Sequence, residues 1–169
     1  LLGWVEAVFI QSKFTFNFIG FDFLQFLHGE KMYAYFFFML IFGLLITFGL
    51  FYRFAMASFT IMWTTVYLIQ KESYNNHYYF LILICVIMIF LPANGKLSVD
   101  AKLFPKIKQT KIPRWMPYLL LFQLAILYFY AAIAKLYPDW LDGTFSKILL
   151  NGITQRQFFL DIFNQKWFL

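Results

Sequence analysis

The chain has very little cysteine and very little charge. Cys85 is the only cysteine among 169 residues, and it lies inside an apolar run. A single thiol in such a run excludes a disulfide framework, a metal–thiolate cluster and an exposed thiol nucleophile. Charged residues make up only 13% of the chain, whereas 62% is hydrophobic and 24% aromatic. Because an average soluble domain is about 45–50% apolar, the composition predicts an integral membrane protein in contact with the lipid bilayer.

The sequence also lacks a signal peptide, an internal repeat and a low-complexity tract. Its first residues, Leu1-Leu2-Gly3-Trp4-Val5, contain no basic region followed by a small-residue cleavage site. Its last residues, Lys166-Trp167-Phe168-Leu169, stop where an interfacial aromatic would normally introduce another span. We therefore expect the sequence to be a fragment of a longer protein.

The net charge of +6 comes largely from one loop between apolar runs. Asp100 is the one acid of this 93–115 loop, against six basic residues: Lys96, Lys102, Lys106, Lys108, Lys111 and Arg114. Such an excess marks a cytoplasmic loop of a membrane protein, and contact with anionic lipids is the alternative for the same residues. We expect a cytoplasmic 93–115 loop and no nucleic-acid partner.

Four apolar runs are close to the ~20 residues that cross a bilayer. They cover approximately 32–52, 54–70, 78–92 and 116–135, and the third is short and ends at Pro92. We predict an all-α, polytopic transmembrane helical bundle over 32–169, with about four spans here and more in the full protein. Residues 1–31 are expected to form an interfacial segment or the tail of a preceding span, because aromatic residues alternate with polar ones at Phe14, Phe16 and Phe18.

Span parity places two polar clusters on the face opposite the basic loop. The connection between the second and third spans and the end of the fourth carry these residues: Asn75, Asn76 and His77, and Lys135, Asp139 and Trp140. The two clusters can therefore share one cavity at the outer face. A lysine buried among membrane helices must be paired or neutral, which makes Lys135 a functional candidate.

Each cluster also has an ordinary structural explanation. The Asn-Asn-His sequence can be a solvated turn, and a lone histidine such as His77 is a poor metal site, so we expect no metal. Lys135 can extend to the lipid headgroups, with Asp139 and Trp140 acting as a helix cap and an interfacial anchor. The residues by themselves leave these alternatives open.

Four ordered blocks carry a family resemblance. They are Gly49-Leu50-Phe51-Tyr52-Arg53; Tyr74-Asn75-Asn76-His77; Leu91-Pro92-Ala93-Asn94 with Ser98-Val99-Asp100-Ala101; and Tyr128-Phe129-Tyr130-Ala131 with Ala134-Lys135-Leu136 and Pro138-Asp139-Trp140. In order and spacing they closely resemble the vitamin K-dependent γ-glutamyl carboxylase family. More broadly they resemble its membrane domain, the horizontally transferred transmembrane (HTTM) domain, whose bacterial members imply a multi-pass protein of the bacterial inner membrane.

The resemblance implies a quinol-dependent reaction. In that family a lysine deprotonates vitamin K hydroquinone, and oxygen converts the quinol anion into a base that removes a glutamate γ-proton before carbon dioxide is captured. Lys135 matches this lysine, while Asn76 and His77 match residues implicated in substrate contact and catalysis. We therefore expect vitamin K hydroquinone or menaquinol as cofactor, with Lys135 and His77 catalytic. The remaining residues have binding roles: Asn75, Asn76, Asp139 and Trp140 for the substrate, and Tyr128 and Tyr130 for the quinol.

Two departures from the family leave a second function open. Ala134 replaces the first lysine of a family pair, and the large β-rich domain that follows in animal carboxylases is absent from this sequence. A lysine is a base only when its amine is neutral, so burial would have to activate Lys135 without a neighbouring cation. The alternative is a non-catalytic membrane subunit or scaffold of a larger complex, with or without a lipid or quinone pocket. A transporter is a weaker possibility, because no paired broken helices are visible.

The charge pattern makes a topological prediction. Single cysteines placed at positions 75 and 102 should be labelled by an impermeant thiol reagent from opposite faces of the membrane, because only the second lies in the basic loop. The measurement is accessibility labelling of oriented vesicles. Labelling of both positions from one face would contradict the predicted topology.

Overall fold

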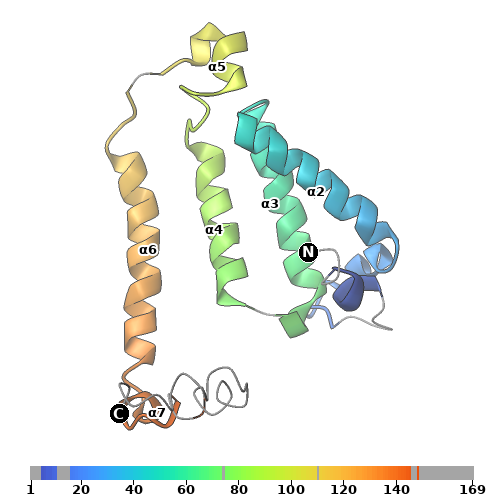
Figure 1. The fold of residues 1–169 in the computed structure, drawn as a ribbon, viewed down its shortest axis with the longest axis vertical. Coiled ribbons are helices and arrows are strands. Elements are labelled where there is room, and N and C mark those ends of the chain that lie inside the picture. Colours follow the sequence, from blue (N-terminus) through green and yellow to red (C-terminus); the bar gives the residue numbers. More distant parts are fainter. Residues whose placement is uncertain (1–4, 11–15, 74, 110, 146–147, 149–169) are drawn as a thin grey trace, which may run out of the picture. The chain divides into compact units, whose positions relative to one another are not determined.

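The computed structural model describes residues 5–10, 16–73, 75–109, 111–145 and 148 (Figure 1). Within these residues every regular element is a helix, which confirms the predicted all-helical fold. The four long helices are α2 (Lys31–Phe48), α3 (Tyr52–Ile69), α4 (Asn76–Phe90) and α6 (Trp115–Ala134). The short ones are η1 (Glu6–Ile10), η2 (Asp22–Leu27), η3 (Lys71–Ser73), α5 (Val99–Leu103), η4 (Pro105–Ile107) and α7 (Pro138–Leu141). The chain divides into two units, residues 1–120 and 121–169, and α6 runs from the first into the second.

The long helices lie where the four apolar runs predict them, but they are not equally suited to a bilayer. Among the described residues α2 and α6 are long and apolar enough to cross a membrane, judged by length and composition. Only 11% of the apolar window of α2 is buried, and none of that of α6, so neither resembles the core helix of a soluble protein. With 15 residues, α4 is about 22 Å long against the ~30 Å of a hydrocarbon core. The prediction of about four spans is therefore not confirmed for α3 and α4.

Helix α2 ends at Phe48, earlier than the predicted boundary at 52, because Gly49 leaves the helical conformation. Gly49 takes a left-handed φ of 63° and donates its N–H to the carbonyl of Ile46. The Leu50 N–H reaches back to the carbonyl of Leu45, 2.9 Å away, so this end has the hydrogen bonding of a glycine-terminated helix. The tight turn allows α3 to start only four residues after α2 ends.

Helix α3 is the central helix of the first unit and packs against α2 and α4 (Figure 1). Its buried side chains are Tyr52, Ala55, Met56, Thr60, Val66 and Ile69. Four of them belong to two apolar clusters: Val66 and Ile69 pack with Phe9 and Met32, while Tyr52 and Met56 pack with Cys85 of α4. Burial on two sides explains why α3 tolerates more polar residues than α2.

The threonines of α2 and α3 form hydrogen bonds within their own helices. Thr60 donates its hydroxyl to the carbonyl of Met56 over 2.7 Å, and Thr64 and Thr65 bond to Thr60 and Ile61 in the same way. Back-bonding to the carbonyl four residues earlier leaves no hydroxyl proton unpaired in apolar surroundings. These residues therefore do not prevent α3 from lying among apolar helices.

The segment before α2 has the exposed aromatic rings that an interfacial segment needs. Phe16 and Phe23 are exposed, whereas Phe18 stacks on Tyr67 of α3 with a ring separation of 5.4 Å. Phe14 lies outside the described residues, as does the C-terminal stretch that suggested a truncated protein. The division between 1–31 and 32–169 stays a prediction.

Gly49 should not tolerate a side chain. A Cβ at this position would overlap the Cβ of Ser98, and a φ of 63° is unfavourable for any residue with a side chain. We expect Gly49→Ala to lower the free energy of unfolding by on the order of 1–3 kcal/mol. The measurement is denaturant or thermal unfolding of the purified protein in one detergent.

Gly43→Ala is the matched control, because Gly43 lies inside α2 and an added Cβ there would have no neighbour within 4 Å. Alanine at that position should be neutral or stabilise by up to ~1 kcal/mol. Equal unfolding free energies for the two variants would contradict the role assigned to Gly49.

Candidate functional site

A buried carboxylate lies where the basic loop folds onto the start of α3. Asp100 is only 4% exposed and belongs to the short helix α5. Helix α5 begins after Ser98 because the Ser98 hydroxyl oxygen accepts the Ala101 N–H over 3.0 Å, an N-cap that holds Asp100 in the first turn. The loop backbone is tied to the α2–α3 turn by the Asp100 N–H, which donates to the carbonyl of Gly49.

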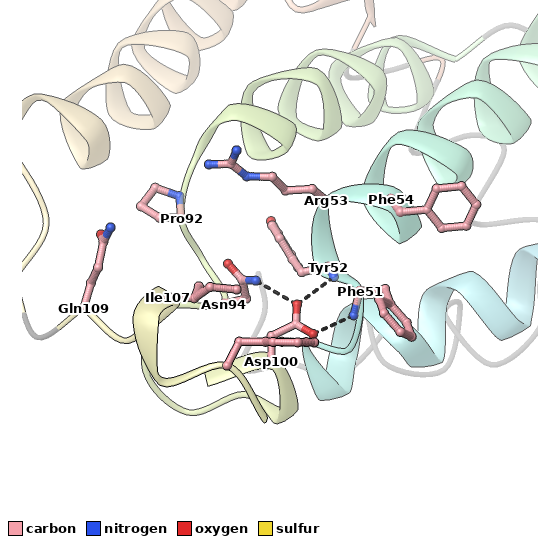
Figure 2. Close-up of a pocket in the computed structure, with 10 residues that line it drawn as sticks. Phe51, Tyr52, Arg53, Phe54, Pro92, Asn94, Asp100, Ile107 and Gln109 are labelled. Carbon is pink, nitrogen blue, oxygen red and sulfur yellow. Dashed lines mark hydrogen bonds between the residues drawn. The ribbon is translucent and has the colours of Figure 1, made fainter. Parts of the chain in front are cut away.

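The Asp100 carboxylate caps α3 from a distance in sequence. One oxygen accepts the Phe51 N–H over 2.8 Å, and the other accepts the Tyr52 N–H over 3.0 Å (Figure 2). The Asn94 amide donates to the second oxygen over 2.8 Å. The residue before α3, Phe51, has a φ of 45° and no capping side chain, so Asp100 supplies the acceptor that the helix start lacks.

Asp100 is held in its ionised form. Burial by itself raises the pKa of this carboxyl, but hydrogen bonds from the Tyr52 N–H, the Asn94 amide and the Phe51 N–H outweigh burial and lower the pKa below its ordinary value. The positive end of the α3 dipole acts in the same direction. Asp100 is therefore a structural anion at neutral pH rather than a general acid.

Sequence reasoning missed this cluster. It used Asp100 only as the one acid in a basic loop, although two of the motif blocks meet here, one containing Gly49 and Phe51 and the other Asn94 and Asp100. The sequence did contain a signal. The residues before α3, Leu50 and Phe51, have no side chain that can cap a helix, and a buried acid such as Asp100 needs hydrogen-bond donors.

A pocket of ≈ 590 Å³ adjoins the capping network. Its walls come from the start of α3 and from the 92–109 segment, and they include Phe51, Tyr52, Arg53, Phe54, Phe104 and Ile107. Arg53 is exposed, and its guanidinium forms no hydrogen bond or ion pair with any residue that the structure describes. Figure 2 shows the guanidinium extended toward Pro92 rather than to the Asp100 carboxylate.

The predicted Asn-Asn-His cluster forms the N-terminal end of α4. The Asn75 side chain accepts the His77 N–H over 2.8 Å, so Asn75 is the N-cap of this helix. Asn76 and His77 occupy the first turn and are exposed. Trp63 of α3 lies beside them, with its ring 5.3 Å from that of Tyr78.

Lys135, the predicted catalytic lysine, directly follows the last residue of α6. The Lys135 Nζ lies 5.5 Å from the centroid of the Trp140 ring, and Trp140 stacks on Phe145 at 4.2 Å. Asp139 is in the first turn of α7, which begins at Pro138. The candidate quinol contacts Tyr128 and Tyr130 are 65% and 66% exposed, as residues facing lipid would be.

Each of the two predicted clusters of site residues lies within one unit of the chain. Asn75, Asn76 and His77 are grouped in the first unit, and Lys135, Asp139 and Trp140 in the second. Convergence of His77 and Lys135 on one cavity stays a prediction.

Within the described residues, no three histidine, cysteine, aspartate or glutamate side chains are grouped so as to hold a metal ion.

The described residues form helices with exposed apolar sides, and two of these helices are long and apolar enough to cross a bilayer, which points to the class of helical membrane proteins. The HTTM domain model matches residues 1–169, and the chain therefore belongs to the HTTM domain family. This confirms the resemblance drawn from the four sequence blocks and makes the protein a member of a membrane-associated, carboxylase-related family. No solved structure matches the chain significantly.

Replacing Asp100 with asparagine should destabilise the first unit. The substitution places an amide against two backbone N–H groups that need acceptors, at a cost of on the order of 3 kcal/mol. Because the pKa of Asp100 is lowered in the folded state, its stabilisation is present above the unfolded-state value of ~3.9 and is lost as the pH falls through the folded-state value. Unfolding followed from about pH 7 down to below the unfolded-state value of ~3.9 should show a smaller acid-induced loss of stability in Asp100→Asn than in wild type.

Asp142→Asn is the control for this prediction. Asp142 also accepts a backbone N–H, from Thr144 over 2.9 Å, but it is exposed to solvent. Its replacement should change the unfolding free energy little. An equal effect of both substitutions would show that burial at the α3 N-terminus does not matter.

Proposed function

We propose that the protein is a carboxylase-related membrane enzyme in which Lys135 is the base that deprotonates a quinol. The observation that supports this most directly is the position of Lys135 at the end of α6, a predominantly apolar helix of 20 residues with no buried side chain. A prenylated quinol dissolves in the bilayer, so its ring can reach the end of a membrane helix without leaving the lipid. Lys135 is the first charged residue after that helix.

The surroundings of Lys135 suit a planar, apolar ring. Trp140 and Phe145 form a stacked aromatic pair beside the amine, and a quinol ring could extend that stack. No carboxylate among the described residues forms an ion pair with Lys135, although Asp139 follows it by four positions. The Lys135 side chain is exposed, so a quinol can reach it without displacing a neighbouring side chain.

The other candidate residues then have defined roles. Lys135 would accept the proton of a quinol hydroxyl, and His77 would move a proton at the substrate. Asn76 would donate its amide N–H to a substrate carbonyl or carboxylate. A bound quinol would supply the reducing equivalents for activating oxygen. Tyr128 and Tyr130 are placed on α6 before the lysine, where exposed rings can guide a ligand that arrives from lipid.

A non-catalytic membrane subunit is the second candidate, and one observation favours it. The Lys135 amine lies over the face of Trp140, the contact that an ammonium group makes when it anchors a helix at the membrane surface. Alanine at position 134, where the family has a lysine, is consistent with the same reading. Activity measurements separate the two candidates.

Lys135→Arg should keep the positive charge and lose the activity. A guanidinium stays protonated, so quinol turnover should fall by roughly 10²–10⁴-fold, the contribution of a general base. Lys135→Ala should be equally inactive but partly rescued by small amines. The measurement is quinol epoxidation by the full-length protein with reduced vitamin K or menaquinol, together with carbon dioxide fixation into a glutamyl peptide.

Lys31→Arg is the matched control. Lys31 also lies at a helix end, with its Nζ 5.9 Å from the centroid of the Phe26 ring, but it has no match to the family lysine. This variant should keep wild-type turnover. Full activity of Lys135→Arg would remove Lys135 from the mechanism, and a wild type that turns over no quinol would favour the non-catalytic subunit.

A further inference from the structure

The basic loop presents charge of only one sign at its surface. Its single acid, Asp100, is buried against the α3 N-terminus, where three donors occupy the carboxylate. All six basic residues of the loop are exposed: Lys96, Lys102, Lys106, Lys108, Lys111 and Arg114. The loop contains charged residues of both signs, but its exposed charged side chains are all basic. Such a cationic surface attracts anions.

The pocket beside this surface combines one cation with apolar walls. Arg53 is the only lysine or arginine that lines it, and Phe51, Phe54, Phe104 and Ile107 are apolar parts of the wall. The wall also includes the polar residues Asn94 and Gln109 and the Asp100 carboxylate, which three donors occupy. Phe51 and Phe54 are 59% and 67% exposed, so the apolar wall continues onto the outer surface of α3. A ligand that fits must carry an anionic group and, next to it, an apolar part.

We propose that this pocket binds the headgroup of an anionic phospholipid, with Arg53 contacting the phosphate. A guanidinium offers two parallel N–H donors to phosphate oxygens, and no residue in the described part of the chain occupies the Arg53 guanidinium. Phe51 and Phe54 then contact the first part of the acyl chains. The loop lysines add attraction for the same headgroup at longer range.

The position of the pocket in the fold favours a lipid over a soluble anion. The pocket lies at the turn where α2, a helix of membrane-spanning length, ends and α3 begins. Lipid headgroups lie at that depth, and exposed aromatic and leucine side chains such as Leu97, Phe104 and Trp115 are typical of the same interface. A soluble phosphate would leave the phenylalanine walls in water.

Arg53→Gln in the full-length protein tests the proposal. Purified protein in a neutral detergent is titrated with phosphatidylglycerol, with phosphatidylcholine and with inorganic phosphate, and the shift in unfolding temperature gives the apparent affinity. Wild type should respond to phosphatidylglycerol at concentrations at which the other two have no effect. Arg53→Gln should weaken the phosphatidylglycerol response by roughly 10-fold or more, and Arg53→Lys by less.

Arg114→Gln is the matched control, because it also removes a guanidinium, but from the basic loop and outside the pocket. It should change the phosphatidylglycerol response less than 2-fold, roughly the effect of one screened surface charge. Unfolding without added lipid should be the same for Arg53→Gln and wild type, since Arg53 has no hydrogen-bond or ion-pair partner among the described residues. Equal weakening in both variants would overturn the proposal in favour of general surface attraction, as would an equal response to phosphatidylcholine or to inorganic phosphate.

Discussion

The first unit depends on the hydrogen bonds that the Asp100 carboxylate accepts at the start of α3. This helix is packed on two sides, so its register and tilt determine where α2 and α4 can lie. Its first N–H groups have no local acceptor, because Phe51 is in a left-handed conformation and has an apolar side chain. A carboxylate from 48 positions later in the chain satisfies them. The first N–H groups of the central helix thus obtain their acceptor from the folded basic loop.

The same interaction has an electrostatic consequence for the surface. Burial of the loop's single acid leaves six exposed cations without a nearby counter-charge from the loop itself. The loop carries the charge asymmetry that orients membrane proteins, and the fold strengthens that asymmetry rather than neutralising it. The network around Asp100 also holds Phe104 and Ile107 opposite Phe51 and Phe54, which creates the pocket. One carboxylate therefore connects helix capping, loop position and surface charge.

Helix α4 separates the capping network from the candidate catalytic residues of the first unit. Asn75, Asn76 and His77 lie at its N-terminal end, whereas Pro92 and Asn94 follow its C-terminal end. About 22 Å of helix lies between them, given 15 residues at ~1.5 Å each. The catalytic role proposed for His77 at one end of α4 and lipid binding at the other are thus separate proposals that concern different residues.

The amino-acid sequence by itself determined the features that depend on local chemistry. Long apolar runs predicted α2, α3, α4 and α6, and the family blocks pointed to the HTTM domain. The end of α2 was placed too late, although a glycine was visible at position 49, because apolar residues continue past it.

Only the tertiary structure decided the role of Asp100. In the sequence it is one acid among six basic residues, and no pattern of spacing links it to Phe51 and Tyr52. The pairing depends on how two distant segments meet in space, and so does the pocket that Arg53 lines. A helix start without a capping side chain shows that an acceptor is needed, but the packing of the loop decides which residue supplies it.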